Sequence, residues 1–473
     1  MPIARRRDDS AGESGRARMC SNSGCMPTVD DLIARAAALR VAGRLDDAAA
    51  ELAAMAAGGA QPPALTYQMA LIEADRGRWD AAVRLALDAA AAGGDAYAQG
   101  AGWLLAKAGR PVEAQAWLER ALARDADDVT ALACLGALHG DARRFDEALR
   151  CIERALVVRP DFPWARACRD RLRSDQQLLA SVEALLAGWR RQNTPATQAG
   201  PDDEIEIPSA FVDARGQPRF RMWLPAARVG ADLGAAQLFR QEVSMGGYEF
   251  PLRRFLDLHL RSDDIFVDVG AHWGIHALTA ATRWPGQVSV LAIEGFPGNA
   301  ARLASWVARN GVGADIETIA AAVGDRVGTA TMRTDAGSSM GHSLLGHDGG
   351  TGAGTPVEVP VTTIDRLLDA RPQLRWRRIV LKLDVEGCEW EALAGARSTL
   401  SSGNVAAVIW ENSHFHAPDE QRRRTRDVVE LLTAHGFAHH VVVREGPGIH
   451  VRPLQDLEAA GDVFSLAPGC AAG

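Results

Sequence analysis

Two acidic residues, each at the end of an apolar segment, have the type and spacing expected of a nucleoside site. Asp268 begins the string Asp268-Val-Gly270-Ala271-His-Trp-Gly274, in which two glycines stand four residues apart. Glycine at such a turn lets the backbone approach a ligand closely. Glu294 ends the next apolar segment, where a carboxylate can accept two hydrogen bonds from a ribose diol. The pair therefore indicates a bound nucleoside.

The glycine spacing differs from that of the dinucleotide-binding fingerprint, which is G-x-G-x-x-G at a helix N-terminus. His272 stands where the second glycine would fall, which disfavours a nicotinamide oxidoreductase. The acid pair instead favours a nucleoside without phosphates, such as S-adenosylmethionine. In that site Asp268, Gly270, Ala271 and Gly274 would shape the methionine pocket. Glu294 would hold the ribose, and Phe296 would lie against the adenine.

A third charged segment runs Lys382-Leu-Asp384-Val-Glu386-Gly-Cys-Glu389 and ends another apolar stretch. Burying charge is costly unless it is paired or used. Two interpretations stay open. Either Lys382 pairs with a carboxylate while Glu386 and Glu389 favour a helix N-terminus electrostatically, or the segment carries chemistry at the end of its strand.

These acids must be positioned by a sheet, because apolar segments alternate with helical ones after residue 262. Such continuous apolar strands predict a parallel sheet covered on both faces, an α/β doubly wound fold with ligands at the carboxyl ends of the strands. The predicted strands are 265–269, 288–293, 316–323, 379–385 and 405–410.

The N-terminal third repeats itself. The matched alanines Ala48, Ala82, Ala114 and Ala148 stand 34, 32 and 34 residues apart. A period near 34 is typical of stacked helix pairs, and this region resembles about four tetratricopeptide units followed by a helix near 163–190. An all-α solenoid of this kind commonly binds a partner protein on its concave face. A role as spacer or dimerisation element is the alternative.

The segment from 244 to 412 resembles the FkbM family of S-adenosylmethionine-dependent methyltransferases, whose domain is a Rossmann-like class I fold. The likeness departs from the family at Gly295-Phe296, where the family often has proline after the acid, and in the glycine-rich stretch 335–354. It rests on these segments in order: Gly-Gly-Tyr248-Glu249-Phe-Pro, the Asp268 turn, Glu294, Ala-Ala-Val-Gly324-Asp, Thr363-Ile-Asp365 and Lys382-Leu-Asp-Val-Glu-Gly-Cys-Glu389.

The resemblance implies methyl transfer to a hydroxyl of a sugar, glycan or secondary metabolite, with S-adenosylmethionine as cofactor. Asp384 would orient the cofactor's amino group or act as base, supported by Lys382 and Glu386. Glu249 would close the site around the cofactor. His414 is a second base candidate, because imidazole titrates near neutral pH, and His342 is a third. No metal is expected. A non-catalytic scaffold with a degenerate methyltransferase-like domain is the alternative.

The chain length and these segments predict a division into four parts. They are a disordered tail (1–27), the helical repeat domain (28–190), a linker (191–208) whose stretch 192–204 contains two prolines, and the methyltransferase-like domain (209–473). The last part should open with a hairpin over 210–222 that turns at Arg215-Gly216.

The composition excludes some partners. The 473 residues carry a net charge of -8, whereas a nucleic-acid surface normally needs a basic surplus. No apolar run is long enough to span a membrane, and the basic start of the chain leads into no apolar segment of a secretory signal. We therefore expect a cytoplasmic protein with no nucleic-acid or membrane partner.

Overall fold

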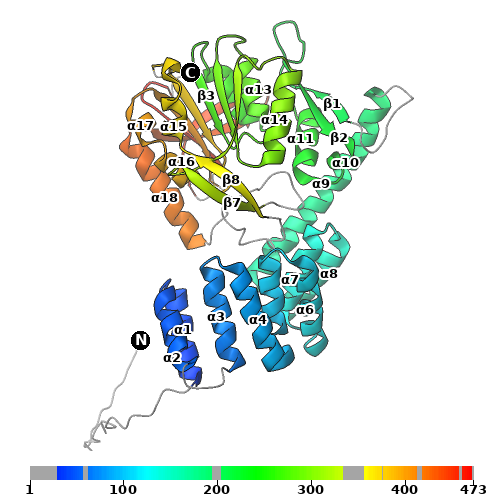
Figure 1. Ribbon diagram of the computed structural model, residues 1–473. Coiled ribbons are helices and arrows are strands. Elements are labelled where there is room, and N and C mark those ends of the chain that lie inside the picture. Colours follow the sequence, from blue (N-terminus) through cyan, green and yellow to red (C-terminus); the bar gives the residue numbers. More distant parts are fainter. Residues whose placement is uncertain are drawn as a thin grey trace, which may run out of the picture.

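The computed structural model describes residues 29–56, 62–193, 204–333, 356–374, 376–412, 418–457 and 461–470. The predicted tail lies outside these residues, as do His342 and His414. A helical array at the N-terminal end stands next to a domain built on a central sheet, and one long helix runs between the two (Figure 1).

The repeats form four antiparallel helix pairs among the described residues. The matched alanines Ala48, Ala82, Ala114 and Ala148 are all fully buried. Small residues let the two helices of a pair pack closely. Gly102 shows this, since a Cβ there would lie 2.7 Å from Leu118 Cγ on the other helix of its pair. The helices are α1 (Val29–Val41), α2 (Leu45–Ala56), α3 (Pro63–Asp75), α4 (Trp79–Gly93), η1 (Gly94–Tyr97), α5 (Ala98–Lys107), α6 (Pro111–Arg124), α7 (Val129–Asp141) and α8 (Phe145–Val158).

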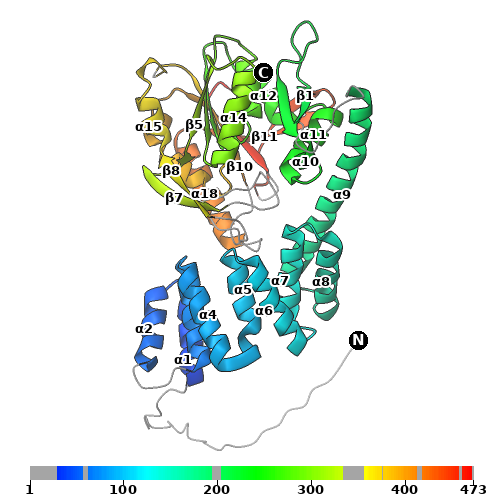
Figure 2. The ribbon, with the colours of Figure 1, turned by 45° about the vertical axis from the view of Figure 1, so that its right-hand side comes forward.

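Helix α9 (Pro163–Asn193) belongs to both parts of the molecule. Its first half packs Cys168 and Leu172 into the core of the last helix pair. Its second half places Val182 and Leu186 in the main core of the sheet domain. Figure 2 shows α9 rising from the array along the side of that domain. The boundary between the two parts therefore lies inside a continuous helix.

The predicted linker 191–208 is wrong at both ends. Helix α9 continues to Asn193, and residues 204–208 form strand β1 (Glu204–Pro208), which pairs with β2 (Arg221–Pro225). The strand alternates exposed glutamate with buried isoleucine. That two-residue period is the mark of a half-buried strand, but it is too short to stand out beside the prolines. The hairpin is confirmed, with a bridge between Val212 and Pro218 and a positive φ of 76° at Gly216.

The central sheet has the strand order β12-β11-β13-β10-β9-β3-β4-β5. The five predicted strands are confirmed as the parallel part, although 316–323 is divided into β5 and β6. That part comprises β3 (Ile265–Val269), β4 (Ser289–Glu294), β5 (Ile316–Ala320), β9 (Ile379–Leu383) and β10 (Val405–Glu411).

The sequence did not predict an antiparallel extension beyond β10 or a second sheet of order β6-β8-β7. The extension is partly exposed and lacks the long apolar runs of the central strands. These additional strands are β11 (Ala438–Glu445), β12 (Gly448–Pro453) and β13 (Asp462–Leu466) in the extension, and β6 (Ala322–Val323), β7 (Gly328–Arg333) and β8 (Pro356–Thr362) in the small sheet.

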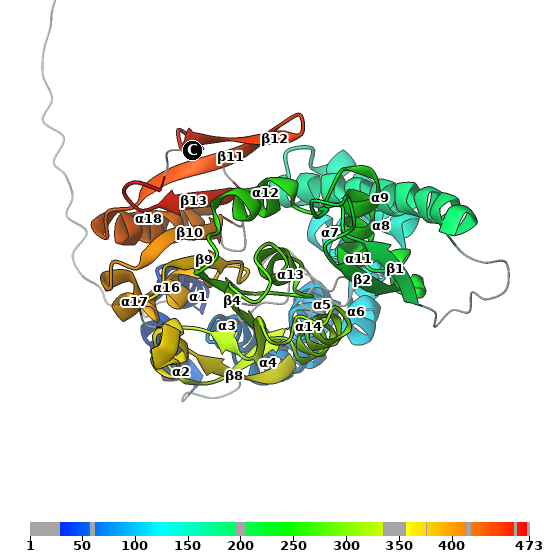
Figure 3. The same ribbon diagram turned by 90° about the horizontal axis from the view of Figure 1, so that it is seen from above.

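Helices cover both faces of the central sheet, as predicted (Figure 3). Each face of the sheet has its own hydrophobic core, and successive side chains of a strand point to opposite faces. In β3, Phe266 packs into one core, and its neighbours Ile265 and Val267 pack into the other. The first core includes α10 (Ala226–Val229), α11 (Leu233–Ser244), α12 (Phe250–His259), α13 (Ile275–Ala281) and α14 (Pro297–Arg309). The second includes α15 (Ile364–Asp369), η2 (Pro372–Leu374), α16 (Glu389–Ala394), α17 (Arg397–Ser401) and α18 (Pro418–Ala434).

The strand order reverses between β3 and β9. From β3 the chain moves to β4 and β5 on one side, while β9 and β10 lie on the other. Ligands of open α/β sheets bind at such a switch point. None of the described helices is both long enough and apolar enough to cross a bilayer.

Candidate functional site

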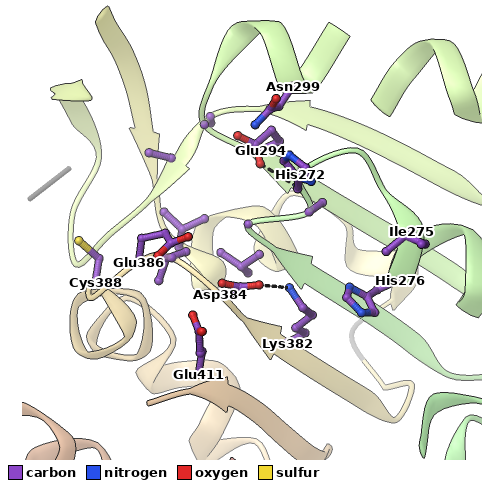
Figure 4. Close-up of a pocket in the computed structure, with 18 of the residues that line it drawn as sticks. His272, Ile275, His276, Glu294, Asn299, Lys382, Asp384, Glu386, Cys388 and Glu411 are labelled. Atoms are coloured by element: carbon purple, nitrogen blue, oxygen red, sulfur yellow. Dashed lines mark hydrogen bonds and ion pairs between the residues drawn. The ribbon is translucent and has the colours of Figure 1, made fainter. Parts of the chain in front are cut away.

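A cavity lies at the switch point, at the carboxyl ends of β3, β4, β9 and β10 (Figure 4). Its lining includes Gly270 and Ala271 from the turn after β3, Glu294 from β4, and Asp384 and Glu386 after β9. The structure therefore brings together the three segments that the sequence singled out, in the place predicted for them.

Glu294 is held in one orientation by the backbone. Its Oε2 accepts a hydrogen bond from the amide of His272 at 2.8 Å, and its Oε1 accepts one from the amide of Phe296 at 2.8 Å. Each carboxylate oxygen keeps a further lone pair for a ligand. Burial raises the pKa of Glu294 to about 7, against the lowering effect of the two amides. The geometry fits a carboxylate that binds a diol.

Lys382 joins the two acids that flank the switch point. Asp268 and Lys382 face each other in register on β3 and β9, with Lys382 Nζ 3.5 Å from Asp268 Oδ1 and 3.1 Å from Asp384 Oδ2. Although burial alone would lower it, the charges of Asp384 and Asp268 raise the pKa of Lys382. Lys382 therefore stays charged at neutral pH and is not a base.

Asp268 differs from its predicted role. The side chain is fully buried and does not line the cavity. Among the described residues it makes no hydrogen bond, and the ammonium of Lys382 balances its charge. Asp268 therefore acts beneath the cavity, by holding Lys382 in place. The aspartate that reaches the cavity is Asp384.

Gly274 and Phe296 also lie outside the cavity lining. Gly274 has a φ of +86°, and a Cβ there would lie 2.2 Å from Leu303 Cδ1. Phe296 packs beside the small cluster of Ala322 and Met332, and only its amide serves the site, through Glu294. Both residues shape the site indirectly. The apolar wall predicted for Phe296 is supplied by Ala322, Val323 and Met332 of the second sheet, which the sequence did not reveal.

The charges of the third segment are partly paired within the chain. Glu389 is buried, and its Oε1 accepts from the amides of Gly387 at 3.2 Å and Val385 at 3.3 Å, in the turn that precedes helix α16. Glu386 lines the cavity, as Asp384 and Lys382 do. The pairing interpretation is thus confirmed for Lys382, and the carboxylates of Asp384 and Glu386 line the cavity.

Gly270 lies where the turn after β3 approaches the chain after β9. Its φ is +75°, and a Cβ there would lie 1.8 Å from the carbonyl oxygen of Asp384. We expect Gly270→Ala to push Asp384 out of place, to abolish nucleoside binding and to lower the melting temperature. Gly286→Ala is the matched control, because Gly286 has the same φ of +75° with nothing within 4 Å.

The control variant should show only the backbone strain, on the order of 1 kcal/mol. Calorimetric titration and thermal unfolding of the two variants measure both effects. If the two variants had equal ligand affinities and equal melting temperatures, the close contact between residue 270 and Asp384 would have no consequence.

Residues with left-handed backbone gather at this cavity. Among the described residues, the non-glycine residues with positive φ are Arg143 in the repeats and Glu249 (45°), His272 (51°) and Glu386 (54°). The last three all line the cavity. Strained conformations persist where the surrounding structure enforces them, and they cluster at functional sites. The strain supports a functional assignment for this cavity.

The cavity is also lined or flanked by polar side chains whose role the sequence did not indicate. Glu411 ends β10 directly opposite Asp462 of β13. Burial and the charge of Asp384 raise the pKa of Glu411 to about 10 and contribute to raising that of Asp462 to about 7. Glu411 directly follows the predicted strand 405–410, so the strand-end rule could have found it. His276 and Tyr248 also line the cavity. Within the described part of the chain, no group of three or more histidine, cysteine, aspartate or glutamate side chains could hold a metal ion.

Comparison with known proteins gives a family match. Residues 268–438 match the family model described as Methyltransferase FkbM domain. This segment carries an FkbM methyltransferase domain. The resemblance predicted over 244–412 is confirmed from residue 268 onward, whereas the segment with Tyr248 and Glu249 lies outside the match. The match extends through α18 to the start of β11. No curated protein matches the chain.

Solved structures with some similarity include methyltransferases and a repeat protein. The FkbM methyltransferase from Methylobacillus flagellatus KT is 17% identical with a TM-score of 0.29, over 49% of this chain and 54% of that one. The chain thus spans about half the length of that protein. The O-methyltransferase TomG from Streptomyces achromogenes, solved with SAM, is 14% identical with a TM-score of 0.28, over 46% and 80%. A tetratricopeptide repeat protein from Parabacteroides merdae ATCC 43184 is 20% identical with a TM-score of 0.27, over 34% and 67%.

Proposed function

We propose that the FkbM domain transfers the methyl group of S-adenosylmethionine to a hydroxyl of a sugar, glycan or secondary metabolite. The observation that carries this proposal is the orientation of Glu294, whose two oxygens are fixed by the amides of His272 and Phe296 at the edge of the cavity. A carboxylate held in this way is suited to the two hydroxyls of a ribose.

The other walls of the cavity fit the rest of this cofactor. Gly270 and Ala271 leave room beside the turn, and the apolar side chains of Ala322, Val323 and Met332 suit a flat base. Carboxylates line the opposite part, where Asp384 and Glu386 would face the positive charges of the methionine end. When bound, S-adenosylmethionine supplies the methyl group and a sulfonium leaving group.

The residues of the chain then act by placement. Lys382 holds Asp384 at 3.1 Å, so that Asp384 can orient the amino group of the cofactor. Positioning of two reactants supplies roughly 7 to 11 kcal/mol of the barrier reduction in favourable cases. We further propose that the helical repeats bind a protein partner that carries or delivers the acceptor, with a spacer or dimerisation role as the alternative.

Isothermal titration with S-adenosylhomocysteine tests the proposal. Glu294→Gln should weaken binding by about 10- to 100-fold, because the amide group can no longer accept hydrogen bonds at both positions. Because the carboxyl of Glu294 titrates at about 7 and only its ionised form accepts from both hydroxyls, wild-type affinity should fall as the pH drops below that value. The variant should lose this pH dependence.

Glu317→Gln serves as the control, since Glu317 lies on the neighbouring strand β5 and pairs with Arg371 outside the cavity. Its affinity should equal that of the wild type. Absence of binding heat in folded wild-type protein would support the scaffold alternative. Incubation of fractionated cell extract with radiolabelled S-adenosylmethionine, followed by isolation of the labelled product, would identify the acceptor.

A further inference from the structure

We propose that Glu249 and His276 form the pair that accepts the proton of the methyl acceptor. This inference rests on the proposed function, and it assigns Glu249 to the acceptor rather than to the cofactor. His276 Nε2 lies 3.0 Å from Glu249 Oε2, and both residues line the cavity. The histidine comes from the first turn of α13 and the glutamate from the turn before α12.

The fold holds the two side chains against each other through a buried ion pair. Glu242 Oε2 accepts from the amide of Tyr248 at 2.7 Å, next to Glu249, and also from Arg253 Nη1 at 2.7 Å. Glu242 and Arg253 have fully buried side chains. Arg253 Nε in turn donates to Thr279 Oγ1 at 2.9 Å, on the same helix as His276. One network therefore fixes both members of the pair.

The backbone of Glu249 is strained to reach this position. Its φ is 45° and its ψ is 49°, and its amide donates to Gln241 Oε1 at 2.9 Å. A left-handed glutamate costs stability and persists where the surrounding structure enforces it. The contacts with Gln241 and His276 do so here.

Charges around the pair keep the glutamate ionised. Burial alone would raise the pKa of Glu249, but its contacts with His276, Lys382 and Tyr248 lower it to about 2. The phenol of Tyr248 also bonds to Glu249, while Asp462 is a nearby acid of like charge. A fixed carboxylate beside an imidazole stabilises the imidazolium that forms when a proton is taken up.

Two other candidate bases among the described residues are engaged elsewhere. Asp384 is held by the ammonium of Lys382 at 3.1 Å, and burial, with the charge of Asp384, keeps Glu411 protonated by raising its pKa to about 10. In Figure 4 His276 lies beside Lys382, away from Glu294. His276 therefore lies on the Lys382 side of the cavity.

The chemical step balances with these groups. The acceptor oxygen forms a bond to the methyl carbon as the carbon–sulfur bond breaks, and the bonding pair stays on sulfur to give S-adenosylhomocysteine. The hydroxyl proton passes to the imidazole of His276, whose positive charge Glu249 neutralises. Solvent later removes that proton, which restores the pair.

Sinefungin tests the position of the pair without knowledge of the acceptor. This analogue carries an amino group where S-adenosylmethionine carries the transferable methyl. We expect wild-type protein to bind sinefungin at least about tenfold more tightly than S-adenosylhomocysteine, through a charge-assisted contact with Glu249. Glu249→Gln should remove this difference and leave the affinity for S-adenosylhomocysteine unchanged. Glu445→Gln is the matched control, because Glu445 forms an exposed pair with His450 at 3.1 Å.

Methyl transfer tests the role of the histidine. With labelled S-adenosylmethionine and the acceptor-containing extract fraction, His276→Asn should slow turnover by about 100-fold or more while nucleoside affinity is kept. The inference would be overturned if Glu249→Gln left the ratio of the sinefungin and S-adenosylhomocysteine affinities unchanged, or weakened the binding of both ligands equally. Full turnover in His276→Asn would overturn it as well. Failure of the wild type to bind S-adenosylhomocysteine would instead overturn the proposed function.

Discussion

A fragment that begins at Ser209 will not form a stable domain, whereas one that begins at Arg173 will. The shorter fragment lacks Val182 and Leu186 of α9 and Ile205 and Ile207 of β1, all of them buried in the core of the sheet domain. Burial of each such side chain contributes about 1.5 to 3 kcal/mol, or about 6 to 12 kcal/mol for the four. That sum is comparable to the entire stability of a typical domain, about 5 to 15 kcal/mol.

Thermal unfolding followed by circular dichroism, with size-exclusion chromatography, measures the difference. The longer fragment should unfold cooperatively as a compact species, while the shorter one aggregates or shows no transition. The double substitution Val182→Asp and Leu186→Asp in the longer fragment should reproduce much of the defect. Equal melting temperatures for the two fragments would show that α9 contributes nothing to the sheet domain.

Lys382→Met will destabilise the whole sheet domain by about 3 to 5 kcal/mol, because it leaves a buried carboxylate without its partner. Asp268 is fully buried, and Lys382 is the cation that balances it. Urea unfolding at neutral pH gives the free energies of unfolding.

Adding Asp268→Asn to Lys382→Met should recover part of the lost stability, since the second change removes the uncompensated charge. Lys107→Met is the control, because Lys107 is the other lysine of the sequence and lies in the last turn of α5. Its effect should be smaller than that of Lys382→Met, because Lys107 is only half-buried. If the double variant is no more stable than Lys382→Met, charge pairing is not what Lys382 provides.

The parallel strands could be predicted because their sequences carry one dominant signal. Strand β3 consists of five buried residues that end in a glycine turn, and its predicted and observed bounds coincide. The same signal placed Glu294 and Asp384 at one edge of the sheet. A parallel strand buried on both faces reads as a continuous apolar run, so its carboxyl end is easy to locate.

Other features depend on tertiary contacts that leave little trace in a single sequence. The sequence indicates that Asp268 follows a strand, but not that Lys382 of a strand more than a hundred residues later turns it away from the cavity. Gly274 and Phe296 lie at the expected turns and yet pack against Leu303 and Met332. His276 lies on a helix two residues after the last glycine, where periodicity predicts only burial.

Glycine would relieve the backbone at Glu249, His272 and Glu386, yet this chain keeps a full side chain at each position. Each such residue costs on the order of 1 to 3 kcal/mol in folding free energy. A version of the protein selected only for heat resistance would lose these side chains first. Thermostability engineering of this chain should therefore leave the three positions untouched and look for its gains at residues that do not line the cavity.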